Sequence, residues 1–407
     1  MRLDRRGLLL GLSAFGLAGF GTAGGRAAFA ALPGERRLVV IILRGGLDGL
    51  AAVAPYADPS YRAARGEHAL PEPGREGGAL DLGGTFGLHP AMVGFHALYR
   101  SGEAAIIHAV AGPYRGRSHF DGQDWMESGA EQRLSGGWLN RAVAAAWPSE
   151  ATARSSASRK GLAAGLNVPL LMKGPARIAN YAPQTFPRLS EDAMRRLAGL
   201  YAADPLLGPV VADGRAGRAF ADGALGQGHG PAANAGTERS AFRSLALAAG
   251  RLLAAADGPR VAALELGGFD THALQAQRLA GALATLDDGL AALKEGLGGA
   301  WGQTAVLAMT EFGRTVAANG TAGTDHGTGG VAFLAGGAVA GGAVRGTWPG
   351  LAPGQLYEGR DLAPTTDLRA IAKALVAAQL GLSEDVLATA VFPGSSAVSP
   401  MRGLLRA

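Results

Sequence analysis

The segment 304–330 combines a short apolar run with a loop that is rich in reactive side chains. Its first six residues form the run, and the loop contains Glu311, Arg314, Asp325 and His326. An adjacent Asp and His can bind a divalent metal, or can act as a proton-transferring base with the acid that orients it. A turn in which Asp325 caps backbone amides and His326 is merely exposed explains the same pair, so both interpretations stay open at this point.

Two other apolar runs end in a similar way. Residues 38–43 lead through a glycine turn to Asp48, and residues 261–266 lead through two glycines to Asp270 and His272. Asp48 is explained equally well as the N-cap of a short helix. Asp and His side chains gathered from several strand ends suit Zn²⁺, or Mn²⁺ and Mg²⁺ where oxygen ligands dominate. Two such ions would stabilise the attacking and leaving oxygens of a phosphoryl or sulfuryl transfer.

A fourth segment places Ser118 between Arg117 and His119, with Arg115 close by. Ser118 is an expected helix N-cap, and a helix N-terminus also binds anions. A serine beside a histidine and arginines has the surroundings of a nucleophile that attacks an anionic ester. Capping alone explains Ser118, but it does not explain the adjacent histidine and arginines.

The elements that must position these segments follow the pattern of an α/β sheet. Buried strands are predicted by apolar runs at 38–43, 104–110, 261–266, 304–309 and 331–334. Helices are predicted by apolar residues at steps of three and four at 90–99, 190–201, 242–253, 279–297 and 366–380. Because the carboxyl ends of parallel strands lie side by side, the reactive segments are expected at one edge of the sheet. Residues 150–240, rich in Gly and Ala, are expected to form an inserted cap-like region rather than sheet.

Residues 1–30 have the pattern of a twin-arginine signal peptide. Arg5 and Arg6 precede an apolar, Gly- and Ala-rich stretch, and Ala28-Phe29-Ala30 is an expected cleavage site. We therefore expect a periplasmic or otherwise extracytoplasmic protein whose single domain is 31–407. An uncleaved membrane anchor is the alternative for the leader, and no later run is long and apolar enough to span a bilayer.

Composition excludes several classes of function. The leader contributes four arginines and one aspartate to a formal net charge of +5, so the remaining chain carries only +2 and shows no basic stripe for nucleic acid. The sequence has no cysteine, which excludes cysteine nucleophiles, cysteine metal ligands and disulfides. A chain of 407 residues is long enough to form a large core without them.

Several motifs together resemble a family of twin-arginine-exported proteins, the domain-of-unknown-function family 1501, which is placed in the alkaline phosphatase and sulfatase-like superfamily. These motifs are LVVIILRGGLDGL, LHPAM, RSHFDGQDWMESG, GGWLNR, GGFDTH, TEFGRT, GTDHGTGG, GTWPGL and PTTDLRAI. The resemblance implies an alkaline phosphatase-like, mostly parallel central sheet sandwiched between helices. It also implies one or two divalent metal ions, zinc before manganese or magnesium, for phosphate or sulfate ester chemistry.

The resemblance also implies roles for individual residues. Asp48 resembles the metal ligand that follows the first strand, and Ser118 resembles the nucleophile. Asp325 and His326 resemble the ligands of one metal. Asp270 and His272 resemble those of the other.

The chain departs from the superfamily pattern because it has no histidine after His326. His119, His89 or Glu311 could take the missing position, or one of the two sites is vestigial. The lack of cysteine and the residues around Ser118 argue against a true sulfatase.

The expected function is a metal-dependent hydrolase of a small phosphate or related anionic ester. In it, Arg117 or Arg314 neutralises substrate oxygens, and Ser118 or a metal-bound water attacks. The alternative is a cell-envelope binding or assembly protein that keeps the fold without catalysis. Beyond the substrate, the expected partner is the export machinery, with no nucleic acid and no stable membrane span after cleavage.

Overall fold

The structure is a computed structural model that describes residues 35–148, 159–182, 190–226 and 237–406. Residues Leu32–Arg406 form one compact unit. The predicted signal peptide lies outside the described residues.

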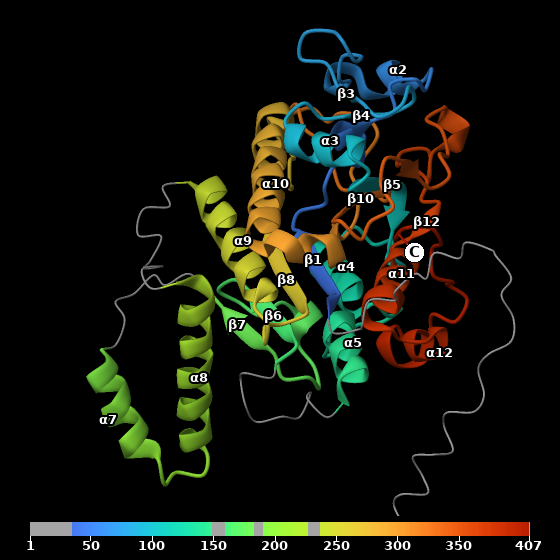
Figure 1. Cartoon of the computed structure of the whole chain (residues 1–407). Coiled ribbons are helices and arrows are strands. Elements are labelled where there is room, and N and C mark those ends of the chain that lie inside the picture. Colours follow the sequence, from blue (N-terminus) through green and yellow to red (C-terminus); the bar gives the residue numbers. More distant parts are fainter. Residues whose placement is uncertain (1–34, 149–158, 183–189, 227–236, 407) are drawn as a thin grey trace, which may run out of the picture. The chain divides into compact units, whose positions relative to one another are not determined.

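A sheet of nine strands forms the centre of the described part of the chain (Figure 1). The strand order is β11-β5-β10-β9-β1-β8-β6-β7, with β12 beside β5. The strands are β1 (Arg37–Leu43), β5 (Ala104–Ala111), β6 (Gly161–Ala164), β7 (Ala179–Tyr181), β8 (Val261–Leu266), β9 (Thr304–Met309), β10 (Gly330–Ala335), β11 (Val344–Arg345) and β12 (Thr366–Asp367). The five strands expected from apolar runs are all confirmed.

Most neighbouring strands run parallel. β1 is parallel to both β8 and β9, and β6 is parallel to both β8 and β7. β10 is antiparallel to β9 and to β5, so β5 runs in the same direction as β9. The expected α/β class, with a mostly parallel central sheet, is therefore confirmed.

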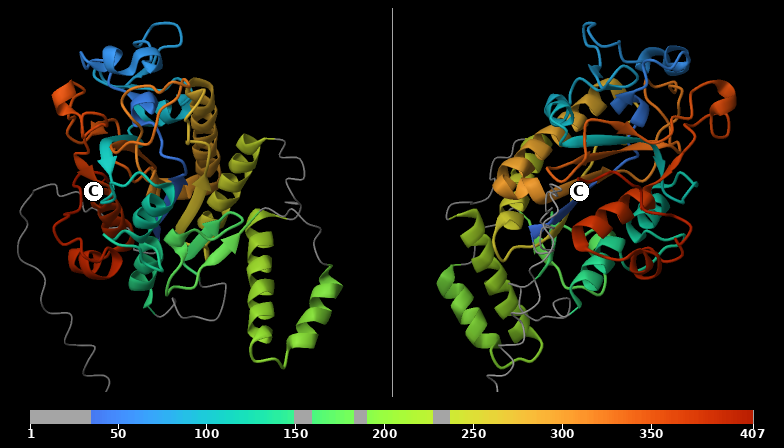
Figure 2. Two further views of the ribbon diagram at one scale, coloured as in Figure 1. Left: turned by 180° about the vertical axis from the view of Figure 1, so that it is seen from behind. Right: turned by 45° about the vertical axis from the view of Figure 1, so that its right-hand side comes forward.

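Helices cover both faces of the sheet (Figures 1 and 2). Successive residues of β1 point to opposite faces, so Val39 and Ile41 belong to one apolar core and Val40 and Ile42 to the other. The first core is closed by α3 (Val93–Arg100), α9 (Glu238–Ala254) and α10 (Gln275–Leu297), and the second by α4 (His119–Ser128), α5 (Trp138–Ala146) and α11 (Leu368–Leu380). The long continuous runs of apolar residues in the strands follow from this burial on both sides.

Smaller elements complete the described chain. A second sheet has the order β2-β4-β3. Its strands and the remaining helices are β2 (Val53–Ala54), β3 (Leu80–Asp81), β4 (Gly87–Leu88), α1 (Gly49–Ala52), α2 (Tyr61–Arg65), α7 (Glu191–Tyr201), α8 (Leu207–Leu225) and α12 (Glu384–Val386). Short 3-10 turns lie at Gly66–His68, Leu170–Met172, Gly298–Gln303 and Pro353–Gln355, and a π-helical turn lies at Leu387–Val391. No helix in the described ranges is both long and apolar enough to cross a membrane.

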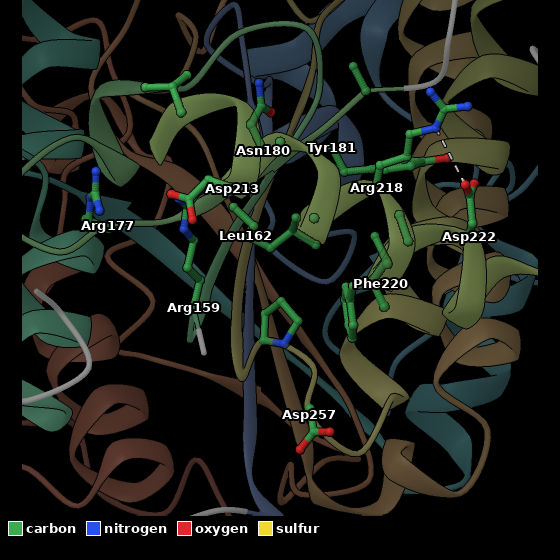
Figure 3. Close-up of a pocket in the computed structure, with 18 residues that line it drawn as sticks. Arg159, Leu162, Arg177, Asn180, Tyr181, Asp213, Arg218, Phe220, Asp222 and Asp257 are labelled. Carbon is green, nitrogen blue, oxygen red and sulfur yellow. Dashed lines mark hydrogen bonds and ion pairs between the residues drawn. The ribbon is translucent and has the colours of Figure 1, made fainter. Parts of the chain in front are cut away.

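The region 150–240 corrects one expectation, because part of it belongs to the sheet. β6 and β7 extend the central sheet beyond β8, whereas we expected no strand of the sheet here. β6 has the sequence GLAA, which lacks the β-branched residues that mark a strand. A cavity of about 620 Å³ lies between these strands and α8, with Arg159, Tyr181, Phe220 and Leu252 in its wall (Figure 3).

Candidate metal centre

The carboxyl ends of β1, β8 and β9 bring three reactive loops together. Leu43 at the end of β1 pairs with Leu266 of β8, and Ile42 pairs with Met309 of β9, so the three strands end at the same edge. Gly45, at a φ of +122°, lies so close to the next loop that an added Cβ would come within 2.3 Å of the Asp270 nitrogen. The glycine turn after β1 thus packs directly against the backbone of a candidate ligand.

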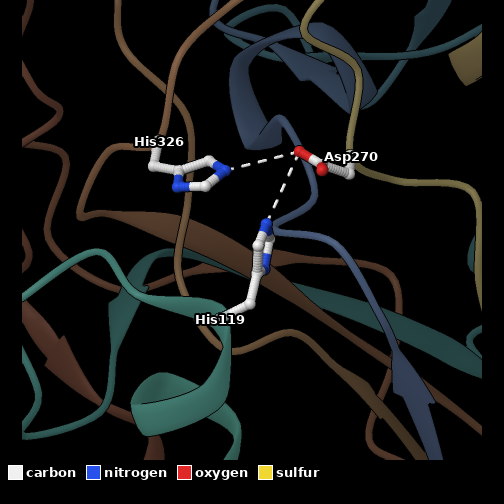
Figure 4. Close-up of side chains that lie close together, drawn as sticks. All are labelled: His119, Asp270 and His326. Carbon is white, nitrogen blue, oxygen red and sulfur yellow. Dashed lines mark hydrogen bonds and ion pairs between the residues drawn. The ribbon is translucent and has the colours of Figure 1, made fainter.

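Four side chains converge at this edge. One ligand atom each from His119, Asp270 and His326 lies within 4.8 Å of the others, an arrangement that can hold a metal ion (Figure 4). Asp270 Oδ1 is 3.5 Å from His119 Nε2 and 3.4 Å from His326 Nε2. His272 Nε2 joins the group at 3.1 Å from Asp270 Oδ1 and 2.9 Å from His326 Nε2.

The other ring nitrogen of each histidine contacts an acceptor. His119 Nδ1 lies 2.8 Å from Glu311 Oε1, and His272 Nδ1 lies 3.3 Å from Asp325 Oδ1. His326 Nδ1 lies 2.9 Å from the carbonyl oxygen of Arg117. Because carboxylates and carbonyls only accept hydrogen bonds, Nδ1 carries the proton in each neutral ring and the Nε2 lone pair faces the cluster.

The lone pairs of the histidine Nε2 atoms and of the Asp270 carboxylate point at one another and repel. A proton or a metal ion between them would remove this repulsion. With their Nδ1 atoms protonated, His272 and His326 present two acceptors to each other at 2.9 Å, beside a carboxylate oxygen. The Nε2 atom of His119 is buried and has no hydrogen-bond partner among the described residues. A proton shared by two nitrogens relieves one of these contacts, whereas a metal ion relieves all of them.

Glu311 fixes the position and the charge of His119. Its buried carboxylate accepts hydrogen bonds from the Gly45 nitrogen at 3.0 Å, Gln123 Nε2 at 3.0 Å and Thr310 Oγ1 at 2.9 Å. Burial alone would raise the pKa of Glu311, but the hydrogen bonds from His119 and the other donors lower it, so the carboxylate is ionised. The hydrogen bond to Glu311 in turn raises the pKa of His119 above its ordinary value, while burial lowers the pKa of His326.

Arg314 has a different role from the expected one of neutralising substrate oxygens. Its guanidinium is fully buried and donates hydrogen bonds to Asp270 and to the carbonyl oxygens of Gly45 at 2.7 Å, Gly46 at 2.8 Å and Thr324 at 2.9 Å. Burial of Asp270 would raise its pKa, but Arg314 holds the pKa of this carboxyl below its usual value. Arg314 therefore ties three loops together and orients a candidate ligand.

Asp48 lies outside the cluster. One of its oxygens caps α1 by accepting hydrogen bonds from the nitrogens of Leu50 and Ala51, each at 3.0 Å. The other oxygen lies 2.6 Å from Arg65 NH2 and 2.7 Å from Gln275 Nε2. Both oxygens are thus occupied, so the helix cap, and not a metal ligand, is the role that the structure gives to Asp48.

The start of α4 contributes His119, and the residues before it contribute through their backbone. Arg117 has a φ of +59°, and its guanidinium binds Asp361 at 2.8 Å and Glu358 at 2.6 Å, away from the cluster, while its carbonyl oxygen holds His326. Ser118 is the N-cap of α4, but its side chain makes no capping hydrogen bond within the described chain. Ser118 is the residue directly before His119 in the sequence.

The remaining predicted residues occupy surrounding positions. Asp325 accepts a hydrogen bond from Asn319 Nδ2 at 3.2 Å and contacts His272, so it lies behind a ligand and not among the ligands. Of the three residues that could replace a missing histidine, His119 is in the cluster and Glu311 is one contact behind it. His89 is buried elsewhere, where burial lowers its pKa to about 4. The cavity in Figure 3 is lined by none of the candidate ligands.

Comparison with known proteins gives one family match. Residues 221–391, less than half of the chain, match the model of a family described as "Protein of unknown function (DUF1501)". The match supports the DUF1501 family. The matched segment contains Asp270, His272, Glu311, Arg314 and His326, whereas His119 lies outside it.

Two other comparisons do not point to a function. No curated protein matches the chain. One similar solved structure is "Crystal structure of Ps i-CgsB in complex with k-i-k-neocarrahexaose", at 13% sequence identity and a TM-score of 0.38. The similarity covers 89% of this chain and 77% of that one, and it is too distant to support a functional argument.

Proposed function

We propose that this protein is a metal-dependent hydrolase of small phosphate or related anionic esters. The observation that carries the proposal is the orientation of three histidines, each with Nδ1 on an acceptor and Nε2 toward Asp270. Metal-binding histidines in proteins have this arrangement, in which a carboxylate or carbonyl behind the ring fixes its tautomer. Membership of the whole chain in the DUF1501 family, and of that family in the alkaline phosphatase-like superfamily, is part of the same proposal.

Zinc fits the donor set best. Three imidazole nitrogens and one carboxylate oxygen are zinc ligands, and bonds of about 2.0–2.1 Å to a tetrahedral ion place neighbouring ligand atoms about 3.3–3.4 Å apart. Asp270 Oδ1 lies 3.1–3.5 Å from the three Nε2 atoms, and the Nε2 atoms of His272 and His326 are 2.9 Å apart. When bound, the ion would polarise an ester oxygen and lower the pKa of a coordinated water. The cluster supports one ion, and manganese or magnesium suits its nitrogen-rich donors less well.

The chain's own residues would complete the site. His119, Asp270, His272 and His326 would hold the ion, and Glu311 would keep His119 oriented and basic. Ser118 stands next to His119 with a hydroxyl that makes no capping bond. It is therefore the proposed nucleophile, and a water is the alternative attacking group.

One observation favours the second candidate, a non-catalytic binding protein of the cell envelope. Neither Arg117 nor Arg314 directs its guanidinium at open space beside the cluster, because both are committed to carboxylates and carbonyls of the chain. A phosphate hydrolase normally supplies a cation for the developing charge. The two candidates are separated by turnover and not by metal binding.

Metal content is the first test. We would purify residues 31–407 without chelator or His tag and measure metals by mass spectrometry. We expect about one equivalent of zinc, lost in Asp270→Asn and His326→Ala, and retained in the control His96→Gln, which changes a histidine bound to the carbonyl oxygen of Asp81. A wild-type protein with no metal, and no thermal stabilisation on adding zinc, would refute the site.

Turnover is the second test. The zinc-loaded protein would be assayed with aryl phosphate, phosphodiester and sulfate substrates. Hydrolysis that Ser118→Ala reduces at unchanged metal content supports the serine nucleophile. Full metal loading without hydrolysis of any of them supports the binding protein.

Export is proposed from the leader alone. Residues 1–30 would direct the folded chain through the twin-arginine route to the periplasm, with cleavage near Ala30. Replacing Arg5 and Arg6 by lysine should leave uncleaved precursor in the cytoplasm. Unchanged processing in that variant would contradict the proposed route.

A further inference from the structure

The hairpin of α7 and α8 buries few of its residues. The two helices lie side by side, and their connecting turn lies at the end away from the central sheet (Figures 1 and 2). The structure describes all of residues 190–226, and in this range α7 has no buried residue and Leu225 is the buried residue of α8. Helices of this length are normally stabilised by burying an apolar face. The last turns of α8 pack against the first core through Phe220, Ala221 and Leu225, whereas α7 has no such apolar contact within the described chain.

The exposed apolar side chains gather at one end of the hairpin. Leu200, Leu206, Leu207 and Val210 are 73%, 75%, 40% and 60% exposed, and Val210 also lines the cavity between α8 and the strands β6 and β7. We call residues 199–212, which contain all four, the apex. A single exposed leucine is ordinary, but several within one turn of the hairpin indicate a surface that is covered in use.

Charge is arranged in order along the hairpin. The apex contains one charged residue, Asp204, whose carboxylate accepts hydrogen bonds from the nitrogens of Leu206 and Leu207 at 2.8 Å. Arg195 and Arg196 follow about one turn behind on α7, with side chains 69% and 82% exposed. Both arginines pair with one acid, Asp192, which lies further from the apex. On α8, Asp213 lies next to the apex and pairs with Arg159 of the main body at 2.7 Å.

We propose that the apex docks onto the surface of a lipid bilayer. Its leucines would enter the region between head groups and acyl chains, and Arg195 and Arg196 would lie level with the lipid phosphates. An arginine side chain reaches toward a head group while its stem covers apolar surface. The apolar apex and the exposed arginines behind it thus match the acyl-chain and head-group layers of a membrane surface. The hairpin would lie on the membrane and not span it.

The same order argues against a second copy of the chain as the occupant. Two hairpins that associate side by side need an apolar stripe along their length. Here the exposed large apolar residues of the hairpin are confined to the apex, while charged side chains such as Arg195, Arg196 and Arg215 occupy exposed positions behind it. This docking does not depend on the proposed hydrolase.

The test replaces two leucines without harming the helix. Leu206 is the N-cap of α8 and Leu207 begins the helix, positions at which Asp is favourable, so L206D/L207D is expected to fold. The control is Leu166→Asp, at a loop leucine that is 73% exposed. Leu200→Gln, on α7, is a second apex variant. Circular dichroism and melting temperature check the fold of each.

The assay is flotation of residues 31–407 with vesicles of phosphatidylcholine and phosphatidylglycerol. This chain keeps the whole compact unit from Leu32 to Arg406 and removes the apolar leader, which could bind lipid by itself. We expect wild type and Leu166→Asp to float, and partitioning of L206D/L207D to fall at least about tenfold, with a smaller loss for Leu200→Gln. The double variant Arg195→Gln/Arg196→Gln should lose more binding to these vesicles than to phosphatidylcholine alone.

Three results would overturn the proposal. The first is a wild-type protein that does not float. The second is flotation that the folded apex variants retain, which would assign binding to another surface. The third is a dimer, measured by light scattering, that L206D/L207D dissociates while no variant binds vesicles.

Discussion

Glu311→Gln isolates the contribution of one charge to the metal centre. Glu311 Oε1 receives hydrogen bonds from the Gly45 nitrogen, Gln123 and His119, and Oε2 receives one from the Thr310 hydroxyl. A glutamine can keep its oxygen at the first position, and its amide can donate to the Thr310 oxygen, because the hydroxyl rotates. The substitution thus keeps the shape and the hydrogen bonds of this buried side chain and removes its negative charge.

The size of the effect follows from the contact to His119. Carboxylates behind metal-bound histidines contribute about 10–100-fold to metal affinity, which corresponds to about 1.4–2.7 kcal/mol. Glu311 also raises the pKa of His119, so protons compete with metal at higher pH in the wild type than in the variant. We therefore expect Glu311→Gln to bind zinc about 10–100-fold more weakly at pH values above the pKa of wild-type His119. This difference should narrow as the pH falls through the raised pKa of wild-type His119.

The assay measures the dissociation constant for zinc by competition with a chromogenic chelator, at a series of pH values on both sides of the pKa of His119. The matched control is Glu265→Gln, another carboxylate at a strand end, which binds Arg44 instead of a ligand. Equal zinc affinity in wild type and a folded Glu311→Gln would refute the role of Glu311. A weakening that stays constant with pH would refute the link to His119 protonation.

Three further predictions concern other buried groups. Asp48→Ala leaves Arg65 buried without its carboxylate, so the free energy of unfolding in urea should fall by about 3–5 kcal/mol while the folded protein keeps its metal; loss of metal from folded protein would restore Asp48 as a ligand. Arg314→Met should destabilise by a similar amount, about 3–5 kcal/mol, and should also lose metal, because Asp270 is no longer held; full zinc content in this variant would contradict that role. Burial lowers the pKa of His108 to about 4. Between pH 6.5 and 4 the unfolded chain therefore takes up a proton that the folded chain does not, and the free energy of unfolding decreases as the pH is lowered. His108→Gln should reduce the loss between pH 7 and pH 5 by about 2 kcal/mol in urea titrations, and an unchanged loss would contradict it.

The sheet could be predicted from sequence wherever its strands are long and buried on both faces. The runs at 38–43, 261–266 and 304–309 consist largely of Val, Ile, Leu, Ala and Met because each side chain enters one of two cores. β6 was not predicted because its four residues, GLAA, include no β-branched side chain, and β7, which has only three residues, was not expected to join the central sheet. Neighbouring strands supply the pairing that their own sequence does not signal.

Most residues of the candidate site could be predicted from the sequence, but the role of each residue could not. His119, Asp270, His272 and His326 follow or precede recognisable elements, so their convergence follows from the strand order. A carboxylate after a strand serves equally as a cap or as a ligand, and only packing shows that both oxygens of Asp48 are occupied. The carbonyl of Arg117 could not be predicted at all, because every residue has one and its direction depends on a positive φ.

The contacts that complete the candidate centre join distant parts of the sequence. His119 and Glu311 are 192 residues apart, and Arg117 and His326 are 209 apart. No short fragment of the chain holds the full set of ligands, so the centre forms only after β5, β10, β9, β1 and β8 have joined in one sheet. In a time-resolved refolding experiment, zinc uptake should lag behind the burial of Trp138 in the core, and the metal would slow unfolding without accelerating folding. The time course of zinc uptake would then report the last step of folding, in which the metal centre forms.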